Sequence, residues 1–484
     1  MMYPRLKLAR NLLTQDGAVF ISIDEVEIGN LKQICNEVFG ENNLIGSMIW
    51  AAGRKNDSKF ISASHEYILC YARSKSVLAE NGITWKVRKK GLDAIYAAAE
   101  QFVRESGGDY DAASAALKAW YKVLADGDDS KKHKHYSRID EHGVYFPGDI
   151  SWPGGGGPKY EVLHPVTGQP VKVPSSGWRF QKDVMDQHIR DNRVLFGATE
   201  DAVPTFKRYL KDTDLEVPYS VFYQDGRAAT KRLTRLMGSK IFDFPKDEYV
   251  LQTLLAMTTE DRDIILDFFA GSGTTAHAVM QLNAEDGGTR RCISVQLPEP
   301  TGEKSEAHKA GYETISEITR ERIRRAGAKI LAEEAGKLDG RADSLDVGFR
   351  AYKLVDTNFT KWKANSGLSK EDLVGLLAGL ADSANDNTTP EILLTEVLLK
   401  LGFSLSEKIE TAQVAGLSVF SIADGLVMAY LDEHITPSLE QLRALVAREP
   451  ERLVILEDAF HGNDELKTNL AQECRTCNVA LWTA

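Results

Sequence analysis

The order of apolar and polar positions along the chain predicts alternating helices and strands at its start. Residues 1–14 repeat apolar side chains at helical spacing, and AVFISID (18–24) is apolar throughout, which indicates a buried strand. VEIGNLKQICNEVF (26–39) predicts a helix that ends at the following glycine. NLIGSMIW (43–50) and HEYILCYAR (65–73) predict two further strands that could form a hairpin.

The pattern changes between about 81 and 240 and then returns to strand and helix. Residues 92–125 are alanine-rich and helical, and residues 150–180 are rich in Trp, Pro and Gly. A loop-rich segment of this kind cannot form a doubly wound sheet alone, so we expect an inserted module. DIILDFFAGSGTTAHAVMQL (263–282) predicts a strand, a glycine turn and a helix, and RRCISVQLPEP (290–300) predicts a second strand.

The last part of the chain predicts a long charged helix at 312–336 and then a separate small domain. LSVFSIADGLVMAYLD and RLVILEDAF indicate strands and helices within that domain. We therefore expect an α/β fold with four segments. These are a first core piece at 1–80, an insertion at 81–235, a second core piece at 236–345 and a C-terminal α/β domain at 346–484.

Composition narrows the class of protein. The apolar fraction is 43% and the charged fraction 27%, as in globular chains, and five cysteines in 484 residues exclude a disulfide-framed secreted scaffold. The start, MMYPRLKLAR, has no apolar signal core. The longest apolar run, Ala415 to Leu431, is interrupted by Asp424. We expect a cytoplasmic protein without a membrane partner.

The net charge of −11 is unevenly distributed. Residues 1–80 hold 9 Lys+Arg and 9 Asp+Glu, residues 81–240 hold 25 and 21, and residues 241–484 hold 25 and 40. The three parts therefore carry net charges of 0, +4 and −15. The mildly basic middle permits contact with nucleic acid, which the total charge alone would argue against.

The sequence DFFAGSGTT (267–275) carries the strongest candidate chemistry. An apolar strand ends in Asp267 and two phenylalanines, and Gly271 and Gly273 then lead into a helix at Thr274. Glycines let a backbone approach a ligand closely, and a helix N-terminus presents unpaired N–H groups. Because ligands of open α/β sheets bind beyond the carboxyl ends of the strands, this turn is a candidate binding site.

Several interpretations of this turn remain open. A P-loop is disfavoured because no Gly-Lys-Ser/Thr follows the glycines. A dinucleotide fingerprint would place Ala276 at its third small position and needs an acid at the end of the next strand, which we expect near Gln296 and Glu299. Asp267 and the aromatic pair instead suit a nucleoside-type ligand with a cationic group. A glycine turn without a ligand is the plainest alternative.

Several stretches in a fixed order carry a resemblance to a known family. FAGSGTT with the preceding Asp267 resembles motif I of the S-adenosylmethionine-dependent amino-methyltransferases of DNA, and KIFDFPKDEYVLQTLL (240–255) resembles the element before it. YPRLKLARNLLTQDGAVFISIDEVEIGNL, IGSMIW and HEYILCYAR resemble segments that follow the catalytic motif in the permuted, β-class order. YETISEITRERIRRA, VGFRAYKLVDTNFTKW (347–362) and LEDAFHGNDELKTNLAQ look like parts of the modification subunit of type III restriction–modification systems.

The catalytic motif of that family is not found in this sequence. These enzymes use a tetrapeptide of the type Asp-Pro-Pro-Tyr, upstream of the segment that matches MMYPRLKLAR, and this sequence contains no Pro-Pro pair. The resemblance therefore implies that no catalytic residue lies in this chain and that a strand is missing between the Asp267 strand and 18–24. It also implies little or no turnover by the chain alone. A non-catalytic remnant that binds DNA or a partner is the alternative to an active enzyme.

The resemblance implies a site-specific DNA adenine-N6 methyltransferase subunit that uses S-adenosylmethionine. It would act on double-stranded DNA, form a homodimer and join a restriction subunit. The two core pieces would form the Rossmann-like methyltransferase sheet in permuted order, and 81–235 would be the target-recognition domain. The ribose would be held by either Gln296 or Glu299, and Phe242 and Phe269 could instead be core residues. The residues that would line or close the cofactor pocket are Asp267, Phe269, Gly271, Gly273, Thr274, Gln296, Glu299, Lys246 and Phe242.

No metal site is expected from the sequence. His65 and Glu66 more simply begin a strand, because no second histidine stands at ligand spacing. Cys474 and Cys477 form a single C-x-x-C without a second pair, which makes a zinc site unfavourable.

Three loops in the middle of the chain could contact DNA or serve the structure alone. SKKHKH (130–135) could contact phosphate or be a solvated loop. WPGGGGPKY (152–160) and SSGWRF (175–180) place aromatic and basic residues on loops. Trp152 and Trp178 could touch DNA or form the core of the module.

Overall fold

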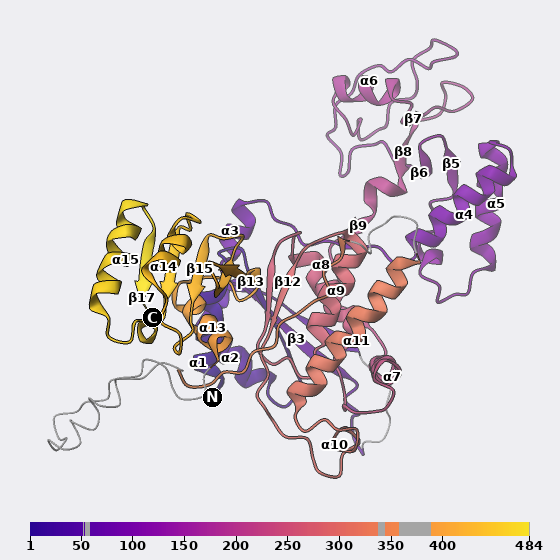
Figure 1. The fold of residues 1–484 in the computed structure, drawn as a ribbon. Helices are drawn as coiled ribbons and strands as arrows, with labels where there is room; N and C mark the ends of the chain where they lie inside the picture. The colour runs from indigo at the N-terminus through magenta and orange to yellow at the C-terminus, as the bar shows by residue number, and fades with distance from the viewer. Residues whose placement is uncertain (52, 54–58, 337–343, 358–388, 484) are drawn as a thin grey trace. The chain divides into compact units, whose positions relative to one another are not determined.

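The computed structural model divides into two compact units, Met1–Gly348 and Phe349–Ala484 (Figure 1). Residues 358–362, the end of one stretch that resembles the modification subunit, lie outside the described residues. The structure describes residues 1–51, 53, 59–336, 344–357 and 389–483.

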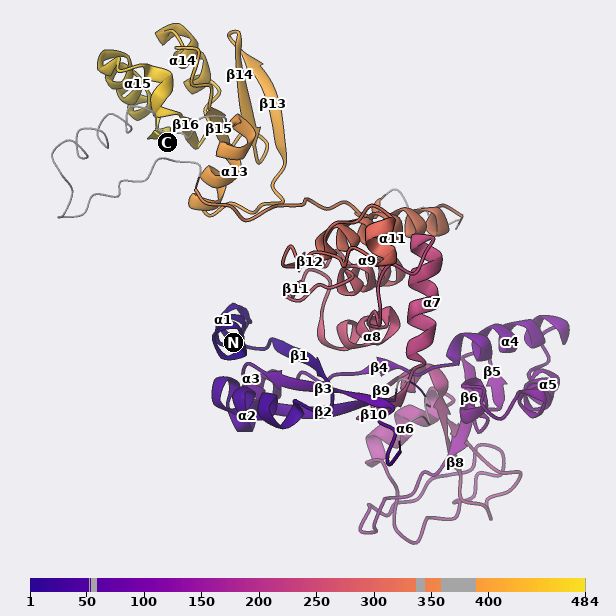
Figure 2. The same cartoon turned by 90° about the horizontal axis from the view of Figure 1, so that it is seen from below.

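A four-stranded sheet in the first unit has the strand order β1-β3-β2-β10 (Figure 2). β3 pairs antiparallel with β1 and with β2, and β10 joins β2 in parallel. The predicted hairpin between the 43–50 and 65–73 patterns is therefore confirmed. The elements of this layer are α1 (Met2–Leu12), β1 (Ala18–Ile23), α2 (Ile28–Phe39), the 3-10 turn η1 (Glu41–Asn43), β2 (Leu44–Ala51), β3 (His65–Ala72), α3 (Lys75–Glu80) and β10 (Val221–Tyr223).

Successive side chains of β3 point to opposite faces of this sheet, and both faces pack against helices. Leu69 and Tyr71 pack with apolar residues of α1 and α2 on one face. Ile68 packs with Trp50 and with α8 (Glu248–Thr258) on the other face. The sheet of the first core piece therefore lies between α1 and α2 on one face and α8 of the second core piece on the other.

β1 is a half-buried edge strand and not the buried strand that its apolar sequence predicts. All its residues are partly exposed, and among the described residues β1 pairs with β3 alone. A strand is fully buried only when neighbours and helices cover it on every side. β11 (Ile264–Asp267) likewise pairs only with β12 (Arg291–Ser294) in the described part of the chain.

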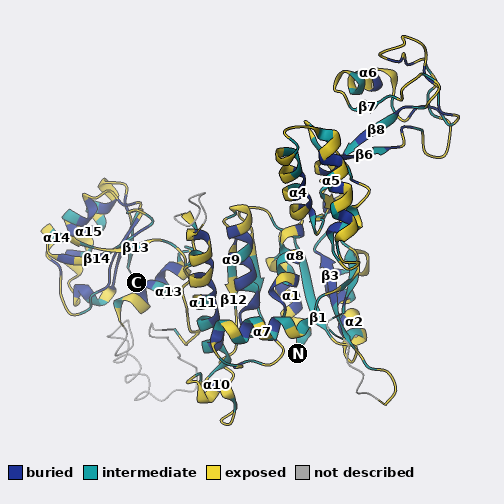
Figure 3. Ribbon diagram, turned by 90° about the vertical axis from the view of Figure 1, so that its right-hand side faces the viewer, coloured by how far each residue is buried: buried dark blue, intermediate teal, exposed yellow. Residues whose placement is uncertain are grey.

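The glycine turn connects a strand to a helix in the second core piece, as the sequence predicts. β11 and β12 run parallel, and α9 follows the turn and packs against α8 and α11. Ala276 and Met280 of α9 share an apolar cluster with Ile323 and Ala326 of α11, and Figure 3 shows much of α9 as buried. The helices of this piece are α7 (Gly226–Met237), α8, α9 (Thr274–Asp286), α10 (Glu306–Lys309) and α11 (Ile315–Ala335).

Two short paired strands bracket residues 89–214, the middle segment. β4 (Val87–Arg88) and β9 (Leu215–Glu216) pair antiparallel and bring the ends of this segment together. Trp178 is fully buried in one of its two apolar clusters, whereas Trp152 is 39% exposed. Its elements are α4 (Leu92–Glu105), α5 (Tyr110–Val123), η2 (Ser130–His133), β5 (Arg138–Asp140), β6 (Gly143–Gly148), α6 (Lys182–Arg190), β7 (Val194–Leu195), β8 (Thr205–Tyr209) and η3 (Leu210–Thr213).

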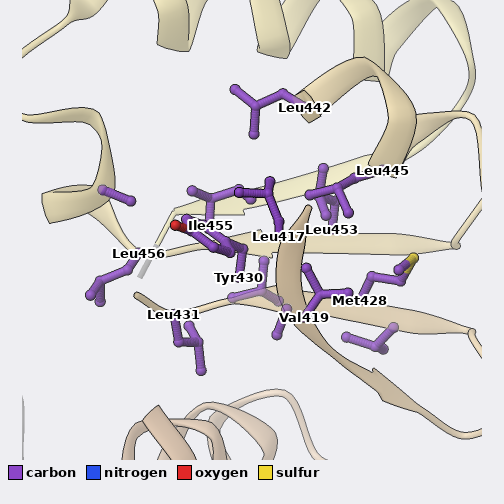
Figure 4. Close-up of a cluster of buried hydrophobic side chains, with 14 of the residues drawn as sticks. Leu417, Val419, Met428, Tyr430, Leu431, Leu442, Leu445, Leu453, Ile455 and Leu456 are labelled. Carbon is purple, nitrogen blue, oxygen red and sulfur yellow. The ribbon is translucent and has the colours of Figure 1, made fainter. Parts of the chain in front are cut away.

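The second unit is built on a mixed sheet with the strand order β13-β14-β15-β16-β17. Ala415 and Gly416 connect β13 to β14 with φ of 49° and 83°, the two positive values that a two-residue hairpin turn needs. Figure 4 shows the apolar core around Tyr430 and Ile455. The elements are α13 (Pro390–Lys400), β13 (Ile409–Val414), β14 (Leu417–Ile422), β15 (Val427–Tyr430), α14 (Leu439–Val446), β16 (Arg452–Ile455), η5 (Glu457–Phe460), α15 (Asp464–Thr476) and β17 (Ala480–Thr483).

Candidate functional site

The glycine turn between β11 and α9 is built around the carboxylate of Asp267. Asp267 Oδ1 accepts a hydrogen bond from the backbone N–H of Phe269 at 3.0 Å, and Oδ2 accepts one from Thr275 Oγ1 at 2.5 Å. Gly271 and Gly273 have φ of 52° and 78°, in the left-handed region that favours glycine. The predicted turn residues therefore define its backbone shape.

The two glycines serve different purposes. A Cβ at Gly273 would lie 3.1 Å from Thr319 Cγ2 and from the Thr319 carbonyl oxygen, so this glycine lets α11 pack against the turn. A Cβ at Gly271 would come no closer than 3.7 Å to a side chain, the ring of Phe242. The Gly271 side of the turn is therefore the side that a ligand can approach.

Gln296 supports the turn from the neighbouring strand's end. Its Oε1 accepts the backbone N–H of Gly271 at 2.8 Å, and its Nε2 donates to the carbonyl of Leu297 at 3.3 Å. The prediction that Gln296 and Glu299 end the second strand is wrong, because β12 ends at Ser294, where β11 turns away. Glu299 lies in the following loop with an exposed side chain.

The remaining predicted residues do not all face the turn. Phe242 lies beside the turn and also packs at the edge of an apolar cluster on α7, whereas Phe269 is 56% exposed and is not a core residue. Lys246 forms an ion pair with Glu66 of β3, which draws its ammonium toward the first sheet. Thr274 is only 4% exposed, so it supports the turn from inside.

Sequence reasoning missed two polar residues of α11 that hold the turn. Thr319 Oγ1 donates to the carbonyl of Gly271 at 2.5 Å. Arg322 Nη1 donates to Ser272 Oγ at 2.8 Å and to Thr274 Oγ1 at 2.7 Å. The available signal was their spacing, because both residues fall on the apolar stripe of an otherwise charged helix.

Arg322 belongs to a buried group of four charges. Its Nη2 lies 3.8 Å from Glu248 Oε2, and Arg232 of α7 pairs with Glu248 at 2.5 Å and with Asp247 at 2.8 Å. Asp247, Glu248 and Arg322 are 0%, 3% and 1% exposed. Two cations and two anions balance, which offsets the large cost of removing isolated charges from water. The group thereby joins α7, α8 and α11 behind the turn.

The electrostatics of this group keep both arginines charged near neutral pH. Burial lowers the pKa of Arg322 to about 10, although Glu248 opposes that shift. Burial alone would also lower the pKa of Arg232, but hydrogen bonds to Glu248 and Asp247 raise it instead. The turn is thus anchored by a permanent buried cation.

A cavity of about 30 Å³ lies beside the charged group. His277 Nε2, Gln281 Oε1, Glu248 Oε2 and Arg322 Nε are buried there without a hydrogen-bond partner in the described part of the chain. A cavity of this size with several polar atoms suits an ordered water. Burial, followed by the charge of Arg322, lowers the pKa of His277 to about 3, so this imidazole is neutral at physiological pH.

Lysines of the SKKHKH loop form ion pairs with nearby aspartates. Lys131 and Lys132 pair with Asp126 at 2.8 Å and Asp129 at 2.6 Å, which favours a solvated loop for SKKHKH. No group of three or more metal-ligating side chains occurs among the residues that the structure describes. Within the same residues, every helix is too short or too polar to cross a membrane.

The Arg322 anchor predicts a large loss of stability when the guanidinium is removed. Arg322→Met would break two hydrogen bonds to the turn and leave Glu248 with one cation, at a cost of about 3–5 kcal/mol. Urea denaturation measures the change. Arg324→Met is the matched control on the same helix, because Arg324 is 58% exposed in its side chain. Equal midpoints for the two variants would contradict the anchoring role.

The neutral state of His277 predicts acid sensitivity. The unfolded imidazole gains a proton below its ordinary pKa of 6.5, whereas the folded one gains it only near 3. The unfolded state therefore binds more protons in that window, and stability falls as the pH drops through it. Between about pH 7 and about pH 5 this loss amounts to about 2 kcal/mol. His277→Gln should flatten the pH dependence of unfolding, and an unaltered dependence would exclude His277 as its source.

Known proteins match this chain over most of its length. The profile of the DNA methylase family (N6_N4_Mtase) matches residues 1–321. The type III restriction-modification enzyme EcoP15I Mod subunit of Escherichia coli is 31% identical over 97% of this chain and 70% of its own length. The StyLTI Mod subunit of Salmonella typhimurium is 31% identical over 73% of this chain and 48% of its own length. The type II methyltransferase M.KpnI of Klebsiella pneumoniae is 29% identical over 66% of this chain and 72% of its own length.

These matches include the glycine turn and the elements that hold it. The family profile covers β11, α9 and Thr319. The match to the EcoP15I relative spans 97% of the chain and therefore extends into the second unit. The chain belongs to the DNA methylase family and, within it, to the Mod subunits of type III restriction–modification enzymes, which are site-specific DNA methyltransferases.

Proposed function

We propose that the glycine turn binds S-adenosylmethionine for methylation of the N6 amine of adenine in double-stranded DNA. The observation that carries this proposal is the turn itself, in a chain of the DNA methylase family. It combines the Asp267 carboxylate, the left-handed Gly271 and the N-terminus of α9 at one sheet end. When bound, this cofactor supplies an electrophilic methyl group on a sulfonium to an attacking amine.

The residues present fit the parts of this ligand. Asp267 supplies a negative charge that favours a cationic group, and the N-terminus of α9 favours a carboxylate. Gly271 presents backbone without a Cβ, and the nearest side-chain atom to that position is 3.7 Å away. The 56% exposed Phe269 offers a ring face to an adenine. Each part of an amino-acid nucleoside thus has a complement beside the turn.

For the ribose we propose Glu299 in preference to Gln296. The Gln296 side chain is already used by Gly271 and Leu297, whereas the Glu299 carboxylate is exposed in the loop after β12. A carboxylate accepts hydrogen bonds from both hydroxyls of a ribose. Phe242 would then close the pocket directly beside Gly271, whereas Lys246 would act only indirectly because it pairs with Glu66.

We further propose that the 81–235 region is the target-recognition part of the methyltransferase. Its support is the net charge of +4 over 81–240 and the pairing of β4 with β9, which sets 89–214 apart from the core sheet. An enzyme that acts on a base must extrude it from the duplex at a cost of a few kcal/mol. Contacts of the recognition part with the DNA backbone would offset that cost.

We propose a restriction subunit, a second copy of this chain and double-stranded DNA as partners in the cytoplasm. The support is the similarity to Mod subunits of type III restriction-modification enzymes over most of this chain. The permuted order of the methyltransferase sheet and the division into two core pieces are part of the same proposal.

Cofactor binding tests the role of the Asp267 charge. Asp267→Asn keeps an oxygen for the Phe269 N–H but removes the charge, so affinity for S-adenosylmethionine should fall by about 10-fold or more in isothermal titration calorimetry. Asp263→Asn is the matched control, because Asp263 accepts from the Glu260 N–H before the start of β11. Unchanged affinity in Asp267→Asn would refute the pocket assignment.

Transfer of a radiolabelled methyl group to mixed-sequence duplex DNA tests the reaction. The proposal places any transferred label in N6-methyladenine, identified by mass spectrometry of the nucleosides, with little turnover by this chain alone because its sequence contains no Asp-Pro-Pro-Tyr-type tetrapeptide. Label in N4-methylcytosine would contradict the choice of adenine. Binding of cofactor and DNA without transfer would instead support the non-catalytic alternative for this chain.

A further inference from the structure

A cavity of about 200 Å³ in the middle segment brings three arginines together. Arg179 comes from the loop before α6, Arg193 precedes β7, and Arg208 stands on β8. Three segments that are separate in the sequence therefore place positive charges around one small cavity. Aromatic rings form much of the remaining wall, from Phe180, Phe206 and Tyr209.

Two of the guanidiniums are held in fixed positions. Arg193 pairs with Asp212 and lies 5.2 Å from the ring centroids of Phe206 and of Tyr209. Its Nε is buried without a hydrogen-bond partner in the described residues. The Arg208 side chain crosses Gly148 of β6, where a Cβ would lie only 2.7 Å from Arg208 Nε. Glycine at this strand position therefore lets Arg208 lie flat toward the cavity.

The charges around the cavity do not balance. Asp212 is the carboxylate on its wall, and it already pairs with Arg193. The nearby Asp149 carboxylate accepts hydrogen bonds from the backbone N–H and the hydroxyl of Ser151, and these bonds, followed by the charges of Arg208 and Arg179, lower its pKa. Asp149 thus offsets part of the positive charge, and three arginines still face two carboxylates. Across the described ranges, neither Arg179 nor Arg208 has a carboxylate within ion-pair distance. Guanidiniums that converge in this way repel one another, and a bound anion removes that cost.

We propose that this cavity binds a phosphate group of the DNA backbone, with Arg179 and Arg208 as its anion-binding side chains. Guanidinium forks match phosphate oxygens bidentately, and stacking on aromatic faces leaves their N–H edges available. Several cations around one small volume fit an oxyanion better than a neutral base edge. The inference rests on the proposed role of this region in DNA recognition. It gives SSGWRF two functions, since Trp178 is core and Arg179 faces the cavity.

Arg179→Gln and Arg208→Gln in the full chain test this site. Binding to duplexes of unrelated sequence is measured by fluorescence anisotropy over a range of salt concentrations. Each variant should weaken binding to all duplexes alike and reduce the slope of log K against log salt by about 1. Arg104→Gln is the control, because Arg104 is an exposed arginine of α4 outside the cavity. It should leave the slope unchanged.

The remaining outcomes separate this inference from the proposed function. Arg208→Lys keeps the positive charge but not the guanidinium group, and it should retain the slope of log K against log salt. A retained slope would show that the effect of Arg208→Gln comes from the lost charge and not from a folding defect. Loss of discrimination between sequences with an unaltered slope would indicate a base contact and overturn the inference. The inference would also be overturned if the glutamine variants lost affinity for inorganic phosphate, titrated without DNA, but kept their affinity for duplex DNA. A wild-type chain that binds no duplex would contradict the proposed function itself.

Discussion

Holding the β11–α9 turn rigid while leaving its Gly271 side open is the constraint on which the first unit depends. Both polar backbone groups of Gly271 are satisfied by side chains from other elements, the N–H by Gln296 and the carbonyl by Thr319. Arg322 fixes the next residues through Ser272 and Thr274. A turn that is fixed in this way is preorganised, so a ligand does not have to order it on binding.

The same constraint explains why distant parts of the sequence must meet. α8 packs with β2 and β3 through one side and with α9 through another. Its N-cap Asp247 and its first residue Glu248 belong to the charged group. Trp50 Nε1 donates to the carbonyl of Gln224 at 2.8 Å, and Lys246 pairs with Glu66. The segment between the middle of the chain and the turn thus connects the first sheet to the candidate cofactor site.

Local chemistry made the turn predictable, whereas tertiary contacts decided the rest. Asp267, Gly271 and Gly273 act within a few residues of one another, so their pattern alone indicates the turn. Arg322 stands about fifty residues away on a helix that looks charged throughout, and its burial depends on pairing with Glu248. The half-burial of β1 could not be read from an apolar sequence, because it depends on which strands lie beside it. α2 followed its strong apolar spacing closely, and α11 formed where a long charged helix was expected.

The position of a bound ligand tests the central claim most directly. A crystal structure of this chain with S-adenosylhomocysteine should show the amino-acid end of the ligand at the N-terminus of α9 and its adenine beside Phe269. The hydrogen bonds of Gln296, Thr319 and Arg322 to the turn should be unchanged. A ligand bound away from Gly271, or a turn that rearranges to fill that side with its own side chains, would contradict the claim.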